Sequence, residues 1–186
     1  MIKLIVGTKG SGKTKAMIDQ INDAVKTSKG NVVVVEKGMK LTYDIAPAAR
    51  LIDLDEYKIS GGEMLYGFVA GLMASNYDIT DLYIDGILKV LDHDINRLGV
   101  VLDEMAAIAG DSVKVTVTVS ADEAALPHDV KKYLSFDKRT GLKAFPTGRR
   151  PEKNKFFRFS ACFGVDKGLL WRYTNKAAFS EVYYAI

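Results

Sequence analysis

Short apolar runs alternate with longer segments of mixed polarity over most of this chain. The run at 4–6 leads into a glycine-rich loop, and apolar residues then recur at helical spacing between residues 13 and 25. At 31–36, four consecutive valines are typical of a strand that is buried on both faces of a parallel sheet. The first 36 residues are therefore predicted to form a strand, a loop, a helix and a second strand.

The same alternation continues to about residue 134. We expect three further strands, at 51–54, 82–85 and 113–120, and three further helices, at 60–75, about 93–109 and about 122–134. Strands and helices in this order predict an α/β fold with three layers and a mainly parallel sheet. Right-handed crossovers bring the carboxyl ends of all strands to one edge of the sheet, where ligands bind in such folds.

The predicted helix at 60–75 has two notable features. Ser60 and Glu63 are spaced as in a capping box, which predicts that Ser60 caps the helix. Gly67 and Gly71 have GxxxG spacing, and we expect them to let the helix lie close against the sheet. The longest apolar stretch, 64–74, is shorter than the roughly 20 residues of a membrane span, so no span is expected.

Composition places the chain among globular proteins in a reducing compartment. It has 186 residues, of which 48% are hydrophobic and 26% charged. The single cysteine, Cys162, has no second cysteine in the chain to pair with, and the first apolar run is too short for the core of a signal peptide. These features predict a cytoplasmic protein.

The glycine-rich loop at 7–14 reads GTKGSGKT and matches the motif G-x-x-x-x-G-K-[ST] in full. Glycines let successive backbone N–H groups point at phosphate oxygens, and the positive end of the following helix dipole assists them. We expect Lys13 to reach the β- and γ-phosphates and the Thr14 hydroxyl to ligate Mg²⁺. The residues predicted to bind nucleotide are Gly7, Thr8, Lys9, Gly10, Ser11, Gly12, Lys13, Thr14 and Lys15.

With this motif the chain resembles the P-loop NTPase superfamily, GTKGSGKT standing as its Walker A motif. The sequence LYIDG at 82–86 resembles a Walker B strand, and this resemblance implies that Asp85 holds Mg²⁺ through water and acts with Lys13 in catalysis. Ser120 resembles the polar sensor residue that the additional-strand class of these ATPases places beside the γ-phosphate. The alternative is that Ser120 or Asp122 only caps the next helix.

The resemblance covers about residues 1–134, and the chain is similar to short bacterial ATP-binding proteins. Some of these are described as relatives of the twitching-motility ATPases, but the acidic and histidine boxes of the motility enzymes are not found in this sequence. The motility function is therefore not carried over. The resemblance implies a P-loop nucleotide-binding domain at 1–134, followed by a C-terminal extension at 135–186.

One residue departs from the pattern of an active ATPase. Many members of this class place a glutamate directly after the Walker B aspartate, to orient or deprotonate the attacking water, and this chain has Gly86 there. Glu36 and Asp53, at other strand ends, are alternative bases, although each is equally compatible with a surface position. Hydrolysis is therefore expected to be slow, or to depend on a protein partner or a second copy of the chain.

The expected nucleotide is ATP with Mg²⁺. A guanine-reading motif of the type N-K-x-D is not present, because the sequence TNKAA at 174–178 has Ala178 in place of the aspartate. ATP is then the default nucleoside triphosphate.

The predicted extension differs in character from the preceding domain. From residue 136 onward it has eleven Lys and Arg against four Asp and Glu, and it holds eleven of the 18 aromatic residues. It fits a small add-on packed on the domain or a poorly ordered extension better than a nucleic-acid surface, although basic residues interleaved with aromatic ones do occur in single-strand binding.

Three functions follow from these features. The first is an ATP-binding P-loop protein with weak or partner-activated ATPase activity, in the manner of a nucleotide-dependent switch. The second is a small-molecule or nucleotide kinase in which Arg139, Arg149 or Arg150 clamps phosphate. The third is a nucleic-acid-associated module in which the nucleotide is structural.

Overall fold

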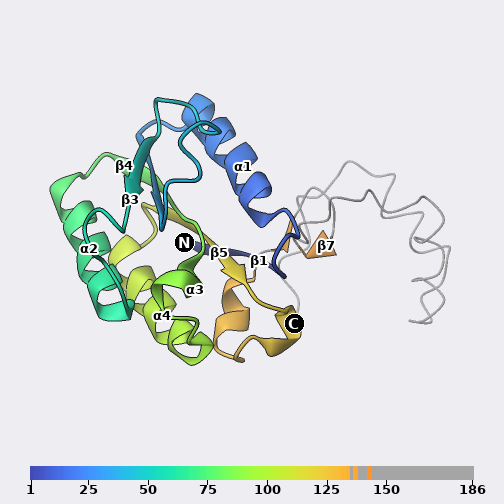
Figure 1. Cartoon of the computed structure of the whole chain (residues 1–186). Helices are drawn as coiled ribbons and strands as arrows, with labels where there is room; N and C mark the ends of the chain where they lie inside the picture. The colour runs from blue at the N-terminus through green and yellow to red at the C-terminus, as the bar shows by residue number, and fades with distance from the viewer. Residues whose placement is uncertain (135, 138–141, 144–186) are drawn as a thin grey trace, which may run out of the picture. The chain divides into compact units, whose positions relative to one another are not determined.

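A five-stranded parallel sheet forms the centre of the described structure (Figure 1). This computed structural model describes residues 1–134, 136–137 and 142–143. The strands follow in the spatial order β1-β5-β4-β2-β3, and all their pairings are parallel. Their bounds are β1 Ile2–Gly7, β2 Asn31–Glu36, β3 Arg50–Asp53, β4 Ile79–Ile84 and β5 Lys114–Ser120. The predicted α/β fold with a mainly parallel sheet is confirmed.

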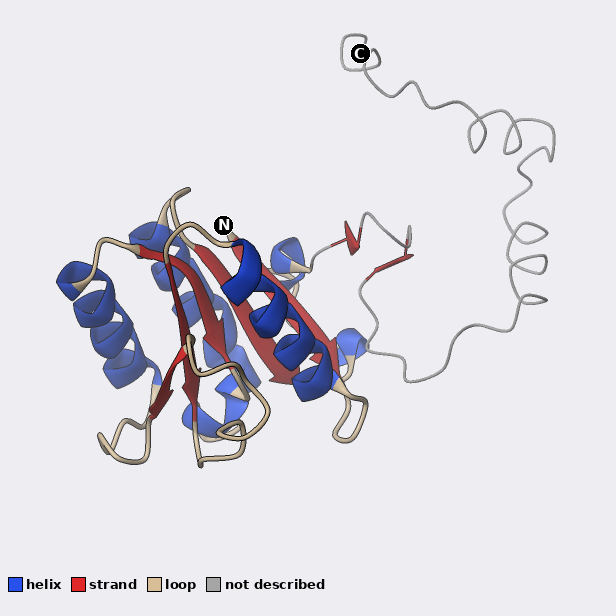
Figure 2. Cartoon of the chain, turned by 90° about the horizontal axis from the view of Figure 1, so that it is seen from above, coloured by secondary structure: helices blue, strands red, loops and turns tan. Residues whose placement is uncertain are grey.

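Helices cover both faces of the sheet (Figure 2). One face carries α1 (Lys13–Thr27), and the other carries α2 (Gly62–Ser75), α3 (Ile87–Val90) and α4 (Leu98–Ala109). The chain moves across the sheet in one direction from β1 to β3 and returns from β3 to β5. Right-handed connections in opposite directions lie on opposite faces, which explains the division of the helices.

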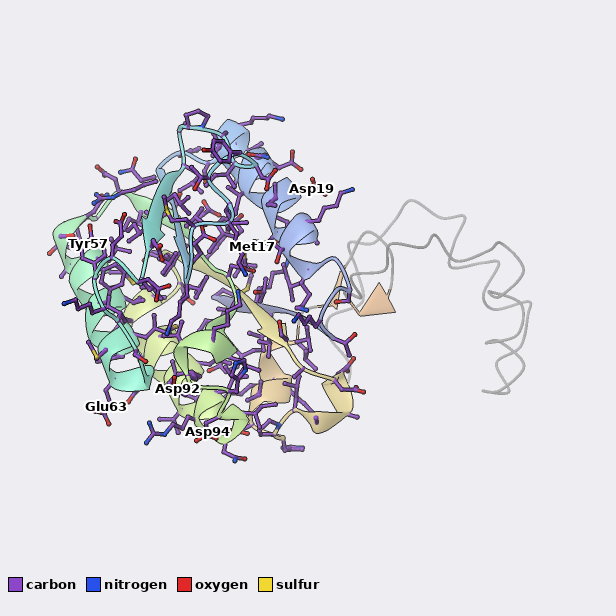
Figure 3. All side chains as sticks on the ribbon, viewed as in Figure 1. Met17, Asp19, Tyr57, Glu63, Asp92 and Asp94 are labelled. Carbon is purple, nitrogen blue, oxygen red and sulfur yellow. The ribbon has the colours of Figure 1, made fainter. Side chains whose placement is uncertain are left out.

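The valine run of β2 explains how both faces are filled. Val33 and Val35 belong to the apolar cluster with α2 and α4, whereas Val32 and Val34 belong to the cluster with α1. Successive side chains of a strand point to opposite faces, so a strand covered on both sides needs apolar residues at every position. On α1, Met17 is buried in the core and Asp19 is exposed (Figure 3).

The connection between β2 and β3, residues 37–49, crosses the sheet without a helix. Its buried apolar side chains belong to the same cluster as α1: Leu41, Ile45 and Ala49. Asn22 of α1 holds the segment with two hydrogen bonds. Its Nδ2 donates to the Asp44 carbonyl oxygen (3.1 Å), and its Oδ1 accepts from the Ala46 N–H (2.8 Å). These bonds satisfy backbone groups that a helix would otherwise have paired internally.

Helix α2 does not begin with the predicted capping box. It starts at Gly62, its N-cap is Gly61 with φ 82°, and no side chain caps it. The start lies close to α4, because a Cβ on Gly62 would stand 2.7 Å from a methyl carbon of Val101. Helix packing and a glycine with positive φ therefore define this helix start, in place of Ser60.

The expectation for Gly67 and Gly71 is also wrong. Leu65 and Val69 are the α2 residues that are buried in the core. Gly67 and Gly71 lie two residues further along, which is the opposite side of a helix, and both are exposed with open space around them. The sequence spacing was the same for both pairs, but only the larger apolar pair contributes to the core.

The predicted helix at 122–134 is replaced by two short 3₁₀ helices, η2 (Glu123–Ala125) and η3 (Val130–Tyr133). Pro127 lies between them, and Leu126 before it is extended, with φ −69° and ψ 134°. Proline lacks an N–H and disfavours helical backbone in the preceding residue, so a continuous helix cannot form here.

The helix predicted at 93–109 begins later than expected. A 3₁₀ turn, η1 (Ile95–Arg97), comes first, and α4 starts at Leu98. The Asp94 side chain accepts from the Asn96 N–H and so caps the turn (3.0 Å).

Little of the predicted C-terminal extension is described. Two short strands, β6 (Phe136–Asp137) and β7 (Leu142–Lys143), pair antiparallel. Cys162, the TNKAA sequence and the three arginines at 139, 149 and 150 lie outside the described residues. Among the helices that are described, none has the length and apolar character needed to cross a membrane.

We predict that Asn22→Ala loosens the segment at 37–49. The variant loses both side-chain hydrogen bonds to this segment, and each is worth about 0.5–1.5 kcal/mol. The free energy of unfolding, measured by urea denaturation, is expected to fall by about 1–3 kcal/mol, with faster hydrogen exchange at Ala46. Asp19→Ala, which removes an exposed side chain from the same helix, is the control. Equal stability of the two variants would contradict the assigned role of Asn22.

Candidate functional site

Three predicted features meet at the carboxyl edge of the sheet. The loop at 7–14 follows β1, Asp85 follows β4, and Ser120 ends β5, which lies between these two strands. Gly7 is the register partner of Ser120. The strand order therefore brings together residues that are up to about 110 positions apart in the sequence.

The loop at 7–14 has the backbone conformation that its glycines permit. Gly10 and Gly12 have φ of 82° and 87°, and a Cβ at either position would meet no atom within 4 Å. These two positions therefore favour glycine because of their positive φ, and not because a side chain would clash there. The Ser11 N–H donates to the Thr8 carbonyl oxygen (3.2 Å), which closes the turn.

Lys13, the first residue of α1, folds back over this loop. Its side chain is buried, and Nζ donates to the Thr8 carbonyl oxygen (2.7 Å) and to Ser11 Oγ (3.5 Å). Burial lowers the pKa of Lys13, and the negative charge of Asp85 opposes this shift. Lys15, two residues further, is exposed.

Asp85 is buried and joins the loop to the sheet. Its Oδ1 accepts hydrogen bonds from Thr14 Oγ1 (3.3 Å) and Thr118 Oγ1 (2.8 Å). Its backbone N–H donates to the Val35 carbonyl oxygen of β2 (2.9 Å). The Thr118 oxygen also accepts from the Gly86 N–H (2.6 Å), so this threonine fixes both residues at the end of β4.

Thr118 was not among the predicted site residues. The sequence shows it only as a mildly polar position in a valine-rich strand. Thr118 reaches the site because it lies two residues before the end of β5, a strand that pairs with both β1 and β4. That pairing could not be read from the sequence.

The two oxygen groups of Thr14 and Asp85 fit a magnesium ion. Mg²⁺ prefers oxygen ligands and is usually held by one or two protein groups, several waters and substrate phosphates. The described residues contain no group of three His, Cys, Asp or Glu side chains that could bind a metal by themselves. Thr14 and Asp85 are thus able to contribute to a site that a phosphate completes.

Gly86 has a left-handed backbone and a lysine beside it. Its φ is 65°, and a Cβ at this position would stand 3.1 Å from both Cε and Nζ of Lys89. Position 86 is therefore next to an ammonium group.

The predicted alternative base Glu36 holds the loop that follows β2. It is almost fully buried, and its two carboxylate oxygens accept from the backbone N–H groups of Lys40 (3.0 Å) and Leu41 (3.1 Å). A buried carboxylate needs such donors.

Asp53, the register partner of Glu36 on β3, holds the same loop. Its carboxylate accepts from the N–H groups of Gly38 (3.0 Å), Met39 (3.4 Å) and Asp55 (3.0 Å). These donors, Gly38 first among them, lower the pKa of Asp53, although burial opposes them. Both acids are therefore engaged with backbone donors.

Ser120 and Asp122 lie at the end of β5. Ser120 is exposed. Asp122 Oδ1 accepts from the Ala124 N–H (3.0 Å), which is the capping role considered as an alternative for this pair.

Two comparisons with known proteins found no relative of this chain. A scan against protein-family models gave no match, and a search of curated proteins found none with significant similarity.

We predict that Gly86→Ala destabilises the fold. An alanine with φ near 65° costs about 1–2 kcal/mol, and the Lys89 side chain must also move away. The free energy of unfolding is expected to fall by that amount. Gly67→Ala is the matched control, because this exposed helical glycine should gain about 0.5–1 kcal/mol on replacement. Loss of stability in both variants, or in neither, would contradict the prediction.

We also predict that Asp53→Asn reveals a pH-dependent contribution to stability. The folded pKa of Asp53 is depressed, so its contribution is complete above the ordinary value of 3.8 and is lost as the pH falls through the folded pKa. The difference in unfolding free energy between wild type and Asp53→Asn should therefore be largest at neutral pH and should shrink below about pH 4. Asp19→Asn is the control for loss of an exposed carboxylate. A difference that stays constant with pH would refute this role.

Proposed function

We propose that this chain is a P-loop protein that binds ATP with Mg²⁺ and hydrolyses it weakly or only with a partner. The observation that carries the proposal is the hydrogen bond between Thr14 and Asp85 (3.3 Å). These residues are 71 positions apart, yet they lie side by side where a phosphate-binding motif and a metal-binding aspartate would have to meet. The position of β5 between β1 and β4 supports the same reading, since the additional-strand class is the one that the sequence resembles.

The loop at 7–14 provides the groups that a triphosphate needs. Backbone N–H groups around Gly10 and Gly12 and the start of α1 are suited to phosphate oxygens. Among the described residues, the ammonium of Lys13 bonds the neutral oxygens of Thr8 and Ser11, and phosphate oxygens would bind it more strongly. Mg²⁺ would be held by Thr14 directly and by Asp85 through water, and it would neutralise phosphate charge.

The carboxylates near the site support slow turnover. A general base needs a free oxygen within hydrogen-bond reach of the attacking water. Position 86 has no side chain, Asp85 is the group proposed to face Mg²⁺, and Glu36 and Asp53 accept from backbone N–H groups. We therefore propose that the chain holds ATP for long periods, as a nucleotide-dependent switch does, and that a protein partner or a second copy accelerates hydrolysis.

The alternative functions rest on segments that the structure does not describe. The arginines proposed to clamp phosphate in a kinase lie outside the described residues, as does most of the basic segment proposed for a nucleic-acid module. The cytoplasm stays the predicted location.

We predict that Lys13→Ala weakens binding of Mg·ATP by at least about tenfold. A hydrogen bond to a charged group is worth about 1.5–3 kcal/mol, and about 1.4 kcal/mol corresponds to tenfold in affinity. Isothermal titration calorimetry measures this loss. Thr14→Ala should instead reduce the gain in affinity that Mg²⁺ provides. Lys29→Ala, which removes an exposed lysine just beyond the far end of α1, is the control for charge.

The proposed function also predicts a low rate of phosphate release. Wild type alone should release phosphate far more slowly than the roughly 10 s⁻¹ that is typical of enzymes. If wild type binds no nucleotide, or if Lys13→Ala binds as tightly as wild type, the proposed function is wrong.

A further inference from the structure

Lys89 lies folded over the residue that follows Asp85. It belongs to α3 and is half-buried, and its Cε and Nζ both stand 3.1 Å from the point where a Cβ on Gly86 would be. A lysine side chain on a short surface helix normally extends into water. This one extends back toward the carboxyl edge of the sheet.

No carboxylate neutralises Lys89 among the described residues. The ion pairs found there join other groups: Asp94 with Arg97, Asp81 with Lys114, and Asp103 with Lys132. Of the acids nearest in sequence, Asp92 and Asp94 are exposed in the loop beyond α3 (Figure 3), and Asp85 accepts hydrogen bonds from Thr14 and Thr118.

A second lysine adds to the positive charge at this edge. Lys37 directly follows β2, the strand that pairs with β4 on the side away from β5. Its Nζ donates to the carbonyl oxygen of Lys89 (3.5 Å). Two ammonium groups thus lie close to α3, one over Gly86 and one at the carbonyl oxygen of Lys89.

We propose that Lys89 binds the terminal phosphate of the nucleotide and makes the site selective for triphosphate over diphosphate. This inference rests on the proposed function, because it assigns a group to the γ-phosphate of a bound ATP. The Lys89 ammonium lies next to position 86, at which other ATPases hold a carboxylate toward that phosphate, and its four-carbon side chain gives it reach. An ammonium group that has no acidic partner among the described residues gains most from the ligand with the greatest negative charge, which is the triphosphate.

The chemistry of lysine distinguishes this role from that of the missing carboxylate. A protonated ammonium cannot accept a proton from water, so Lys89 does not act as a general base. It stabilises the charge of the intact triphosphate. A lysine at this place, instead of a carboxylate, therefore favours binding of ATP and does not supply a base for hydrolysis.

The test compares two nucleotides on three variants. Affinities for Mg²⁺ with a non-hydrolysable ATP analogue, and for Mg²⁺ with ADP, are measured by calorimetry on the full chain. Lys89→Ala is expected to bind the analogue about tenfold to a hundredfold more weakly and to bind ADP as wild type does. Lys89→Arg should retain most of the discrimination, because it keeps the charge. Lys29→Ala should change neither affinity, and urea denaturation checks that each variant is folded.

The outcomes separate this inference from the proposed function. If wild type binds both nucleotides and Lys89→Ala loses affinity for both equally, or for neither, Lys89 does not recognise the terminal phosphate and the inference alone is overturned. Loss of discrimination in Lys89→Arg as great as in Lys89→Ala would also overturn the role of charge. If wild type binds neither nucleotide, the proposed function fails and this inference fails with it.

Discussion

The buried carboxylate of Asp85 is the group on which the candidate site depends. A carboxylate in the interior is costly unless hydrogen bonds compensate it, and here the hydroxyls of Thr14 and Thr118 do so. Its own N–H is bonded to Val35 of β2. One residue, at the end of the middle strand β4, therefore joins the start of α1, strand β5 and the end of β2. Substitution of either threonine would disturb the geometry of a region to which three separate segments of the chain contribute.

The same principle explains the neighbouring strand ends. Glu36 and Asp53 end β2 and β3 side by side, and both direct their oxygens at backbone N–H groups of the loop that follows β2. Each acid gains the donors that burial requires, and the loop gains acceptors that it would otherwise lack. This exchange helps the segment at 37–49 to cross the sheet without a helix. It also explains why two acids at the ligand edge of an α/β sheet need not be catalytic, although their position alone had made them alternative bases.

Features that depend on a local sequence pattern could be predicted. Features that depend on which side of a helix faces the core, or on which strands are neighbours, could not. The valines of β2 and the GTKGSGKT loop have local signatures, and the strand, the loop and the helix lie where these signatures indicated. Gly67 and Gly71 share one spacing with Leu65 and Val69, so only packing decides which pair faces the core. The roles of Thr118 and Lys89 depend on strand order and on a side chain that folds back over a glycine. Pro127 is different, because it is a local signal against a continuous helix at 122–134, and it overrides the periodic pattern there.

The ammonium group of Lys89 beside Gly86 places a positive charge at the carboxyl edge of the sheet. A carboxylate side chain at position 86 would begin within 3.1 Å of the Lys89 ammonium, and the two charges would pair with each other. The carboxylate would then be a poorer base, and the ammonium would be less available to an anion. A chain that needs a free positive charge at this place therefore gains from a residue without a side chain, and only glycine also accepts the left-handed backbone there without strain. The lack of a carboxylate at position 86 and the presence of a lysine without an ion pair among the described residues are thus two consequences of one local arrangement, and under the proposed function this arrangement would favour retention of a triphosphate over its hydrolysis.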